Sequence, residues 1–165
     1  MKIYLLIINF LLVFQIASGQ DLNLSIGEID TIVNRIDSTS ISGGITDYTI
    51  ESKNKKTKKM ITGNGADWFY VDTTGKLLKV VREVTAGSEN FDTYYFHQNT
   101  LIYLKTTNCS YSGDKRIVNW NRRCYFQGGK LVLYQDSLTI PFNPKNYIET
   151  AKDFFVGRQI WKKNN

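Results

Sequence analysis

The stretch Cys124–Asp136, CYFQGGKLVLYQD, contains both strands and the turn of a β-hairpin. Aromatic residues precede the pair Gly128-Gly129 and branched aliphatic residues follow it, and both classes favour strands. Glycine readily adopts the positive φ angles that a two-residue hairpin turn requires. The stretch therefore predicts two antiparallel strands joined by a tight turn.

Two further stretches repeat this arrangement. Tyr94–Thr106, YYFHQNTLIYLKT, aligns without a gap at an offset of 30 residues (Gly129 against Asn99) and places Gln98-Asn99 at the turn. Asp67–Val81, DWFYVDTTGKLLKVV, needs a longer loop with Gly75 in the left-handed conformation. Because an isolated hairpin is only marginally stable, we expect the three units to join one sheet. Their irregular spacing argues against a solenoid and for a meander.

Additional strands flank these units. Ile45–Ser52 and Lys58–Thr62 form a plausible first hairpin, Gly63–Gly65 is interpreted as a loop between strands, and Arg116–Arg123 leads into the strand that holds Cys124. The sequence thus predicts six to eight antiparallel strands between about residues 45 and 136.

A helix is expected at each end of the sheet, over about 26–37 and about 144–162. The first begins with a capping-box pattern, Ser25 to Glu28, and the second with Asn143-Pro144, a capping side chain followed by a proline in the first turn. Apolar residues then recur at helical spacing. They are Ile26, Ile29, Val33 and Ile36 in the first helix and Tyr147, Ile148, Ala151, Phe154 and Phe155 in the second.

The strands are apolar on both faces in places, as in Trp68–Val71 and Leu131–Tyr134. A sheet with one wet face would alternate between apolar and polar residues, so the second face must be covered. The two amphipathic helices are the simplest cover, which gives an α+β fold. A curled sheet that encloses an apolar ligand, or a permanent protein partner, would also cover it.

The first nineteen residues have the layout of a secretory signal peptide. Lys2 precedes an apolar run, Ile3–Ile16, and the small residues Ala17-Ser18-Gly19 follow. The run has 14 residues, whereas a membrane span needs about 20, so an uncleaved anchor is the less favoured reading. We expect cleavage before Gln20 or Asp21, one globular domain over 20–165 without a membrane span, and a periplasmic or extracellular location.

The two cysteines, Cys109 and Cys124, would meet an oxidising environment after export, which favours a disulfide between them. Closing a loop of about 15 residues would stabilise the fold by about 3 kcal/mol. The alternative is two buried thiols on separate strands. If the chain between them is a regular hairpin turning near Gly113, Cys109 faces Val118 and the bridge cannot form.

Five lysines lie close together in Lys53–Lys59, KNKKTKK, in a chain of formal net charge +6. Such a cluster can attract an anionic partner or surface, and Lys53, Lys55, Lys56, Lys58 and Lys59 are the candidate binding residues. An exported protein seldom meets nucleic acid, so a nucleic-acid partner is not expected. The alternative is a solvated turn whose charges discourage edge-to-edge association.

The residues that usually carry catalysis are scarce. His97 is the only histidine, no zinc-ligand spacing is present, and no nucleophile, phosphate-loop or dinucleotide motif occurs, so neither a metal nor a cofactor is expected. Four carboxylates could still converge as in a glycosidase: Glu51, Asp67, Asp92 and Asp136. We therefore predict a non-enzymatic binding domain for a protein or anionic surface ligand. The alternatives are a carrier of an apolar molecule and, last, a carboxylate-based hydrolase.

Overall fold

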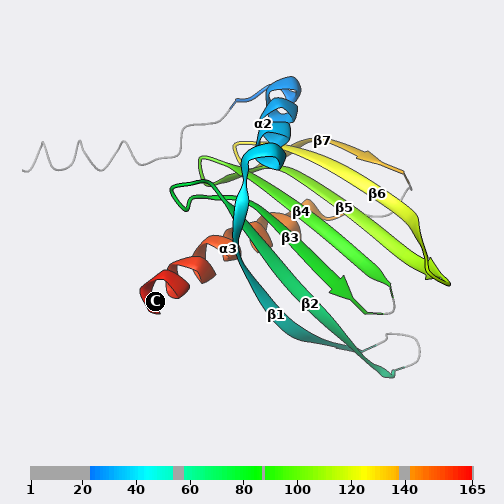
Figure 1. Ribbon diagram of the computed structural model, residues 1–165. Helices are drawn as coiled ribbons and strands as arrows, with labels where there is room; N and C mark the ends of the chain where they lie inside the picture. The colour runs from blue at the N-terminus through cyan, green and yellow to red at the C-terminus, as the bar shows by residue number, and fades with distance from the viewer. Residues whose placement is uncertain (1–22, 54–57, 87, 138–141, 165) are drawn as a thin grey trace, which may run out of the picture.

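A computed structural model describes residues 23–53, 58–86, 88–137 and 142–164. Seven strands form one antiparallel sheet in which each strand pairs only with its neighbours in sequence (Figure 1). The elements in chain order are α2 (Ile26–Thr39), β1 (Ile41–Lys53), β2 (Met60–Val71), β3 (Leu77–Thr85), β4 (Glu89–His97), β5 (Thr100–Ser112), β6 (Lys115–Gln127), β7 (Lys130–Asp136) and α3 (Pro144–Asn164). The predicted α+β meander with a helix at each end is confirmed. The predicted signal peptide lies outside the described residues.

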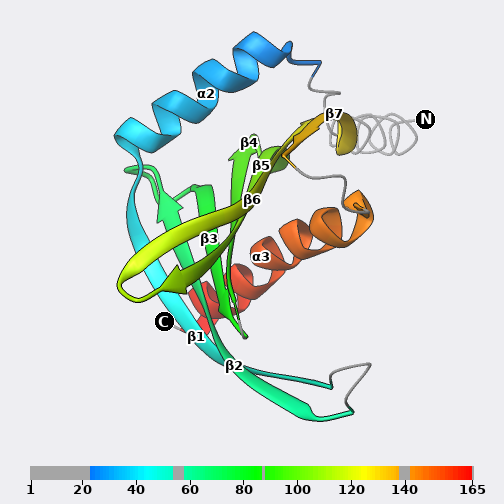
Figure 2. The same ribbon diagram turned by 90° about the vertical axis from the view of Figure 1, so that its right-hand side faces the viewer.

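The two helices cover opposite faces of the sheet (Figure 2). On the face that we call the α2 side, Ile29, Ile32 and Ile36 pack against a group of tyrosines and Ile102. On the α3 side, Ala151 and Phe154 pack against a larger apolar cluster. This arrangement explains why some strands are apolar on both faces, because each helix buries part of one face.

The predicted turns are confirmed. Gln98 and Asn99 have φ angles of 49° and 62°, and Gly128 and Gly129 have φ angles of 52° and 74°, as a tight turn of this kind requires. Gly75 is also left-handed, with φ 80°, at the end of the longer loop.

Each of the three hairpins carries a β-bulge just beyond its turn, which the sequence patterns did not predict. The extra residue is Leu78 between β2 and β3, Ile102 between β4 and β5, and Val132 between β6 and β7. A bulge shifts the pairing of all later residues by one position. The bulges therefore decide which side chains lie opposite each other across the sheet.

The interpretation of Gly63–Gly65 as a loop is wrong, because these residues lie inside β2. The glycines are required there by close contacts. A Cβ atom at Gly65 would lie 2.2 Å from Cε2 of Tyr48, and one at Gly63 would lie 2.3 Å from the carbonyl oxygen of Thr85. β1 and β2 consequently form one long hairpin rather than two short strands and a separate loop.

The predicted disulfide is also wrong, because Cys109 and Cys124 are free, buried thiols. Cys124 pairs with Leu104 on the α3 side, whereas Cys109 pairs with Val118, as the alternative reading required. Successive side chains of β5 point to opposite faces, so Cys109 lies on the α2 side. The two sulfurs are therefore on different faces of the sheet.

Local contacts fix α2 on the sheet. Its predicted capping box is present, with the Glu28 backbone N–H donating to Ser25 Oγ at 3.3 Å. Two buried tyrosine hydroxyls donate to its exposed carboxylates: Tyr95 to Asp37 at 3.1 Å and Tyr125 to Asp30 at 3.0 Å. Because Tyr95 is on β4 and Tyr125 on β6, α2 crosses several strands.

Candidate functional site

A row of side chains on the α2 side crosses the whole sheet in register, next to the tyrosines that α2 covers. We call it the outer row. Its members are Ile45, Trp68, Val81, Thr93, Lys105, Arg123 and Gln135, one from each strand in order. The row changes from apolar side chains on β1–β3 to basic side chains on β5 and β6.

Both ends of the outer row are accessible. Ile45 is 49% exposed and Trp68 is 38% exposed, so two large apolar side chains from adjacent strands lie together on the surface. Lys105 and Arg123 are exposed and lie directly opposite each other. Like charges in that position destabilise a sheet pair, so this pair does not contribute to the stability of the sheet.

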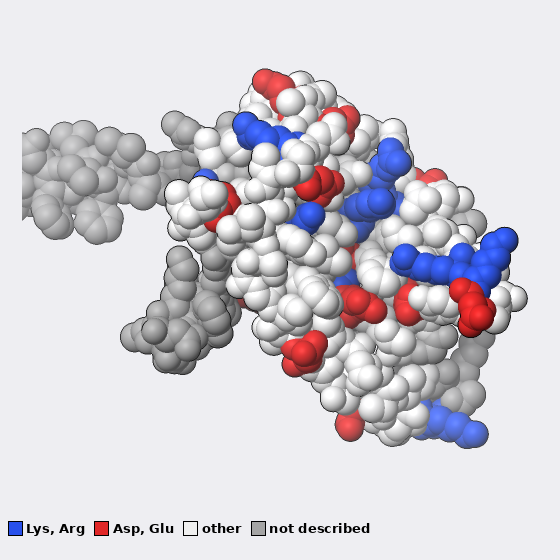
Figure 3. Space-filling model, viewed as in Figure 1, with Lys and Arg blue, Asp and Glu red and all other residues white. Residues whose placement is uncertain are grey.

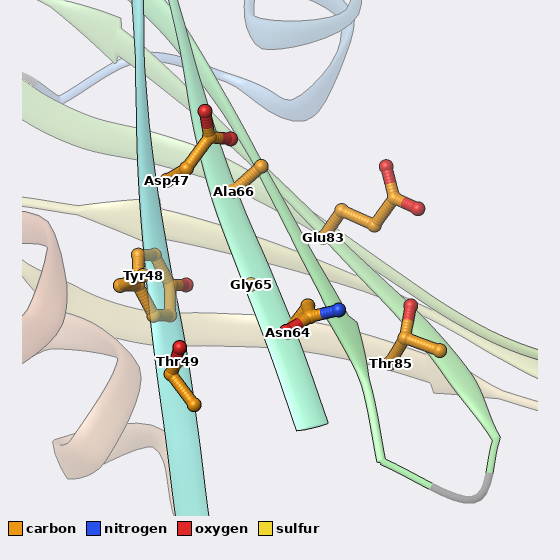
Figure 4. A pocket seen from close by; sticks show the side chains of 8 residues that line it. All are labelled: Asp47, Tyr48, Thr49, Asn64, Gly65, Ala66, Glu83 and Thr85. Atoms are coloured by element: carbon orange, nitrogen blue, oxygen red, sulfur yellow. The ribbon is translucent and has the colours of Figure 1, made fainter. Parts of the chain in front are cut away.

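An open hollow of about 460 Å³ adjoins the apolar end of the outer row (Figure 4). It is lined by Asp47, Tyr48, Thr49, Asn64, Gly65, Ala66, Glu83 and Thr85. The register places Asp47, Ala66 and Glu83 in the row after Ile45 and Trp68, on the same face. Among the described residues, neither the Asp47 nor the Glu83 carboxylate has an ion-pair or hydrogen-bond partner, so both oxygens can accept from a ligand.

The charges on the α2 side are separated by position. Figure 3 looks onto this face and shows acidic side chains over β1–β3 and basic side chains toward β5 and β6. Asp47 and Glu83 contribute to the acidic part, and Lys105 and Arg123 to the basic part. A ligand on this surface would therefore be oriented by its own charges.

The predicted lysine cluster lies at the β1–β2 turn, away from the basic end of the outer row. Lys53 ends β1, and the exposed residues Lys58 and Lys59 precede β2. Lys55 and Lys56 lie outside the described residues. The binding role of the cluster stays a prediction.

A second row crosses the α3 side and is made of charged and polar residues. We call it the charged row. It consists of Asp67, Arg82, Asp92, Thr106, Arg122 and Asp136, each paired in register with the next from β2 to β7. The sequence patterns did not predict this row, because its register depends on bulges at Leu78, Ile102 and Val132 and on a further register shift at Asn119 in β6.

The two arginines of the charged row turn outward to the carboxylates at its ends. Arg82 donates through Nε and Nη2 to the two carboxylate oxygens of Asp67, both at 2.8 Å, and Arg122 donates through the same two nitrogens to Oδ2 of Asp136. Burial would lower the pKa of Arg82, but the hydrogen bonds and charge of Asp67 outweigh it and raise that pKa. In each of these hydrogen-bonded ion pairs, the arginine neutralises the charge of its carboxylate partner.

Asp92 lies in the middle of the charged row and has no such partner. Its Oδ1 atom and Oγ1 of Thr106 are both buried and lack a hydrogen bond of normal geometry to any described residue. Burial raises the pKa of Asp92 to about 6, and the nearby Thr106, Arg82 and Arg122 reduce this effect only in part. Asp92 is therefore a carboxyl group that changes charge near neutral pH.

The candidate hydrolase carboxylates are distributed between two faces. Asp67, Asp92 and Asp136 all belong to the charged row, whereas Glu51 lies on the α2 side by its register. Asp67 and Asp136 are held in ion pairs. His97 ends β4, and burial, Lys76 and Arg35 lower its pKa, so it lies near α2 rather than near these carboxylates. The ion pairs of Asp67 and Asp136 stabilise the fold, whereas Asp92 has no ion-pair partner among the described residues and Glu51 lies on the other face.

Within the described parts of the chain, no three His, Cys, Asp or Glu side chains come together as a metal site requires. None of the described helices combines the length and apolar character that crossing a membrane demands. No known family model matches the sequence, and no curated protein or solved structure matches the chain.

Proposed function

We propose that this chain is an exported, non-enzymatic domain that binds a protein partner through the outer row and the adjoining hollow. The observation that carries the proposal is the exposure of Ile45 and Trp68 side by side at the edge of an open hollow. Large apolar side chains grouped beside polar ones are typical of interaction surfaces. Tryptophan in particular contributes much of the binding energy where it becomes buried.

The charges define the kind of partner. Its apolar side chains would cover Ile45 and Trp68, and its acidic side chains would meet Lys105 and Arg123 at the other end of the row. Hydrogen-bond donors of the partner, such as a lysine or a hydroxyl, would enter the hollow beside Asp47 and Glu83. An acidic group placed there would be repelled, which fixes the orientation of the complex.

The alternative of an apolar carrier has less support. A carrier needs empty space inside the curve of the sheet, but aromatic rings fill the α3 side. Phe154 packs edge-on against Tyr94 and Phe69, with ring centroids 5.1 and 6.0 Å apart, and Phe155 packs against Phe96 at 5.0 Å. The open surface of the α2 side is a better place for a ligand.

Site-specific photo-crosslinking in the organism that makes the protein tests this proposal. A crosslinking amino acid at Thr93, in the middle of the outer row, should give one discrete adduct. The same residue at Lys152, which is exposed on α3 on the opposite face, is the matched control and should not give it. The additional substitution Trp68→Ala should abolish the Thr93 adduct. Equal adducts from Thr93 and Lys152 would refute the proposed surface.

A salt titration of the purified complex tests the electrostatic part. Affinity should fall with increasing ionic strength, because exposed charges are screened. The double substitution Lys105→Gln and Arg123→Gln should weaken binding and flatten the salt dependence. The lysine cluster can be tested alongside with Lys58→Gln and Lys59→Gln. Binding that does not change with salt would remove the proposed attraction to an acidic partner.

A further inference from the structure

The charged row contains one more negative charge than positive charge when all its groups are ionised. Arg82 is paired with Asp67 and Arg122 with Asp136, so each pair is neutral. The remaining charge is that of Asp92, whose Oδ1 atom is buried without a hydrogen-bond partner. An unpaired charge in such a place is costly, and a carboxyl group avoids the cost by taking up a proton.

Thr106 lies opposite Asp92 in the β4–β5 register, and its Oγ1 atom is also buried. Burial raises the pKa of Asp92 by more than the Thr106 hydroxyl, as a hydrogen-bond donor to the carboxylate, lowers it. A neutral Asp92 can instead donate one hydrogen bond to Oγ1 of Thr106, so Thr106 accommodates both charge states and burial decides between them. The proton comes from solvent and remains on Asp92.

The helix α3 and the residue before it supply the cover over this row. Phe154 lies over the guanidinium of Arg82, with 4.8 Å from Cζ to the ring centroid, and Phe142, just before α3, lies over that of Arg122 at 4.2 Å. The Tyr147 ring lies near that of Tyr94, with centroids 6.5 Å apart, and burial, followed by the charge of Asp92, raises the pKa of Tyr147. α3 and Phe142 thus lie over both arginines that flank Asp92, so docking of α3 reduces the access of water to this half-buried carboxylate.

We propose that the charged row is a proton-controlled seat for α3, which holds the helix firmly when Asp92 is neutral and less firmly when Asp92 is ionised. The linkage is reciprocal: if docking of α3 favours protonation of Asp92, then protonation favours docking by the same factor. The raised pKa of Asp92 supports this direction. In an exported protein that passes between acidic and neutral surroundings, the packing of α3 on the sheet would thereby become stronger or weaker with pH.

Other ionisable groups near Asp92 do not reproduce this behaviour. Those that face it are Arg82 and Arg122 on the flanking strands, Asp67 and Asp136 at the ends of the row, Tyr94 and Cys124 beside it, and Tyr147 from α3. Burial is the main cause that raises the pKa of Tyr94 and Tyr147, and it raises that of Cys124 to about 12. None of the three changes charge between pH 5 and pH 8.

Hydrogen exchange of the α3 amides tests the proposal in the full protein. After correction for intrinsic exchange rates, α3 should be more protected at pH 5 than at pH 8. The ratio should be about tenfold, because the pKa of Asp92 is 3.8 in the open state and about 6 in the docked state, so protonation favours docking about tenfold at pH 5 and hardly at all at pH 8. Asp92→Asn, which keeps the shape and cannot ionise, should remove this difference.

Two further variants keep the test decisive. Asp153→Asn removes an exposed carboxylate of α3 and should leave the pH dependence unchanged. Phe154→Ala weakens the cover and should lower the pKa of Asp92, measured by NMR of its carboxyl carbon, toward 4. This measurement also holds if Asp92→Asn fails to fold. Equal α3 protection at pH 5 and pH 8, or an unchanged pH dependence in Asp92→Asn, would overturn the proposal.

Discussion

Arg122 and Asp136 face each other across β6 and β7 with side chains that are only 3% and 8% exposed. Two charges in such a place are stable only as a pair, because each has lost its contact with water. The same is true in lesser degree of Arg82 and Asp67, whose side chains are 28% and 9% exposed. The charged row is thus held together at both ends by ion pairs.

Replacing one member of the Arg122–Asp136 pair should destabilise the protein strongly. Arg122→Met keeps most of the side-chain volume but leaves Asp136 buried without its partner, which costs about 3–5 kcal/mol. The free energy of unfolding from urea denaturation measures this loss. The double variant Arg122→Met and Asp136→Leu should recover most of it. If the double variant is no more stable than Arg122→Met, the ion pair is not what Arg122 contributes.

Removing the charge of Asp92 should stabilise the protein above neutral pH. The folded-state pKa of about 6 lies above the unfolded value of 3.8, so the folded protein binds the proton more tightly. The contribution of this group is therefore most favourable below about pH 4, and it is lost as pH rises through about 6. Asp92→Asn should raise the unfolding free energy at pH 8 by up to about 3 kcal/mol and at pH 5 by about half as much. A stability difference that is the same at both pH values would contradict the assignment.

Gly65 should tolerate no side chain while Tyr48 is present. Gly65→Ala would place its Cβ 2.2 Å from the Tyr48 ring, and overpacking of this kind costs about 1–3 kcal/mol. Combining Gly65→Ala with Tyr48→Ala should reduce that cost, as thermal unfolding of the variants can show. Gly27→Ala is the matched control, because no atom lies within 4 Å of its added Cβ and it lies in a helix. It should stabilise the protein by about 0.5–1 kcal/mol.

The two thiols should be free in the native protein and unreactive. Cys109 and Cys124 are both 0% exposed, and burial raises the pKa of Cys124 to about 12, so its reactive thiolate is scarce. A thiol reagent should modify neither cysteine in the native state and both after unfolding without a reducing agent. Recovery of a disulfide-linked peptide from protein kept under oxidising conditions would contradict the structure.

The hairpins could be predicted because their information is local. Turn residues that accept positive φ and strand residues on either side lie within a few positions of each other, as at Gln98-Asn99 and Gly128-Gly129. Helix ends were predictable for the same reason, since the Ser25 capping box is a contact between near neighbours. Such patterns do not depend on the rest of the fold.

The rows across the sheet could not be predicted, because a single bulge changes every pairing beyond it. Counting outward from the turn at Gln98-Asn99 without a bulge would place Asp92 opposite Lys105. The bulge at Ile102 places it opposite Thr106 instead. The bulge at Val132 in the same way gives Arg122 the partner Asp136 rather than Gln135. Gly63–Gly65 was misread for a related reason, because only the folded protein shows which atoms a Cβ would meet.

Each strand pairs with the next strand in sequence, and this order affects how the sheet folds. Each ladder joins two segments that are adjacent in sequence, so it can close as soon as its second strand is available. Closing short loops costs less entropy than joining distant segments, and proteins rich in local pairings fold fast. The sheet can therefore assemble from β1 to β7 in the order in which the chain emerges during synthesis. Because α3 follows β7 in sequence, the α3 side of the sheet stays open until after all seven strands have emerged.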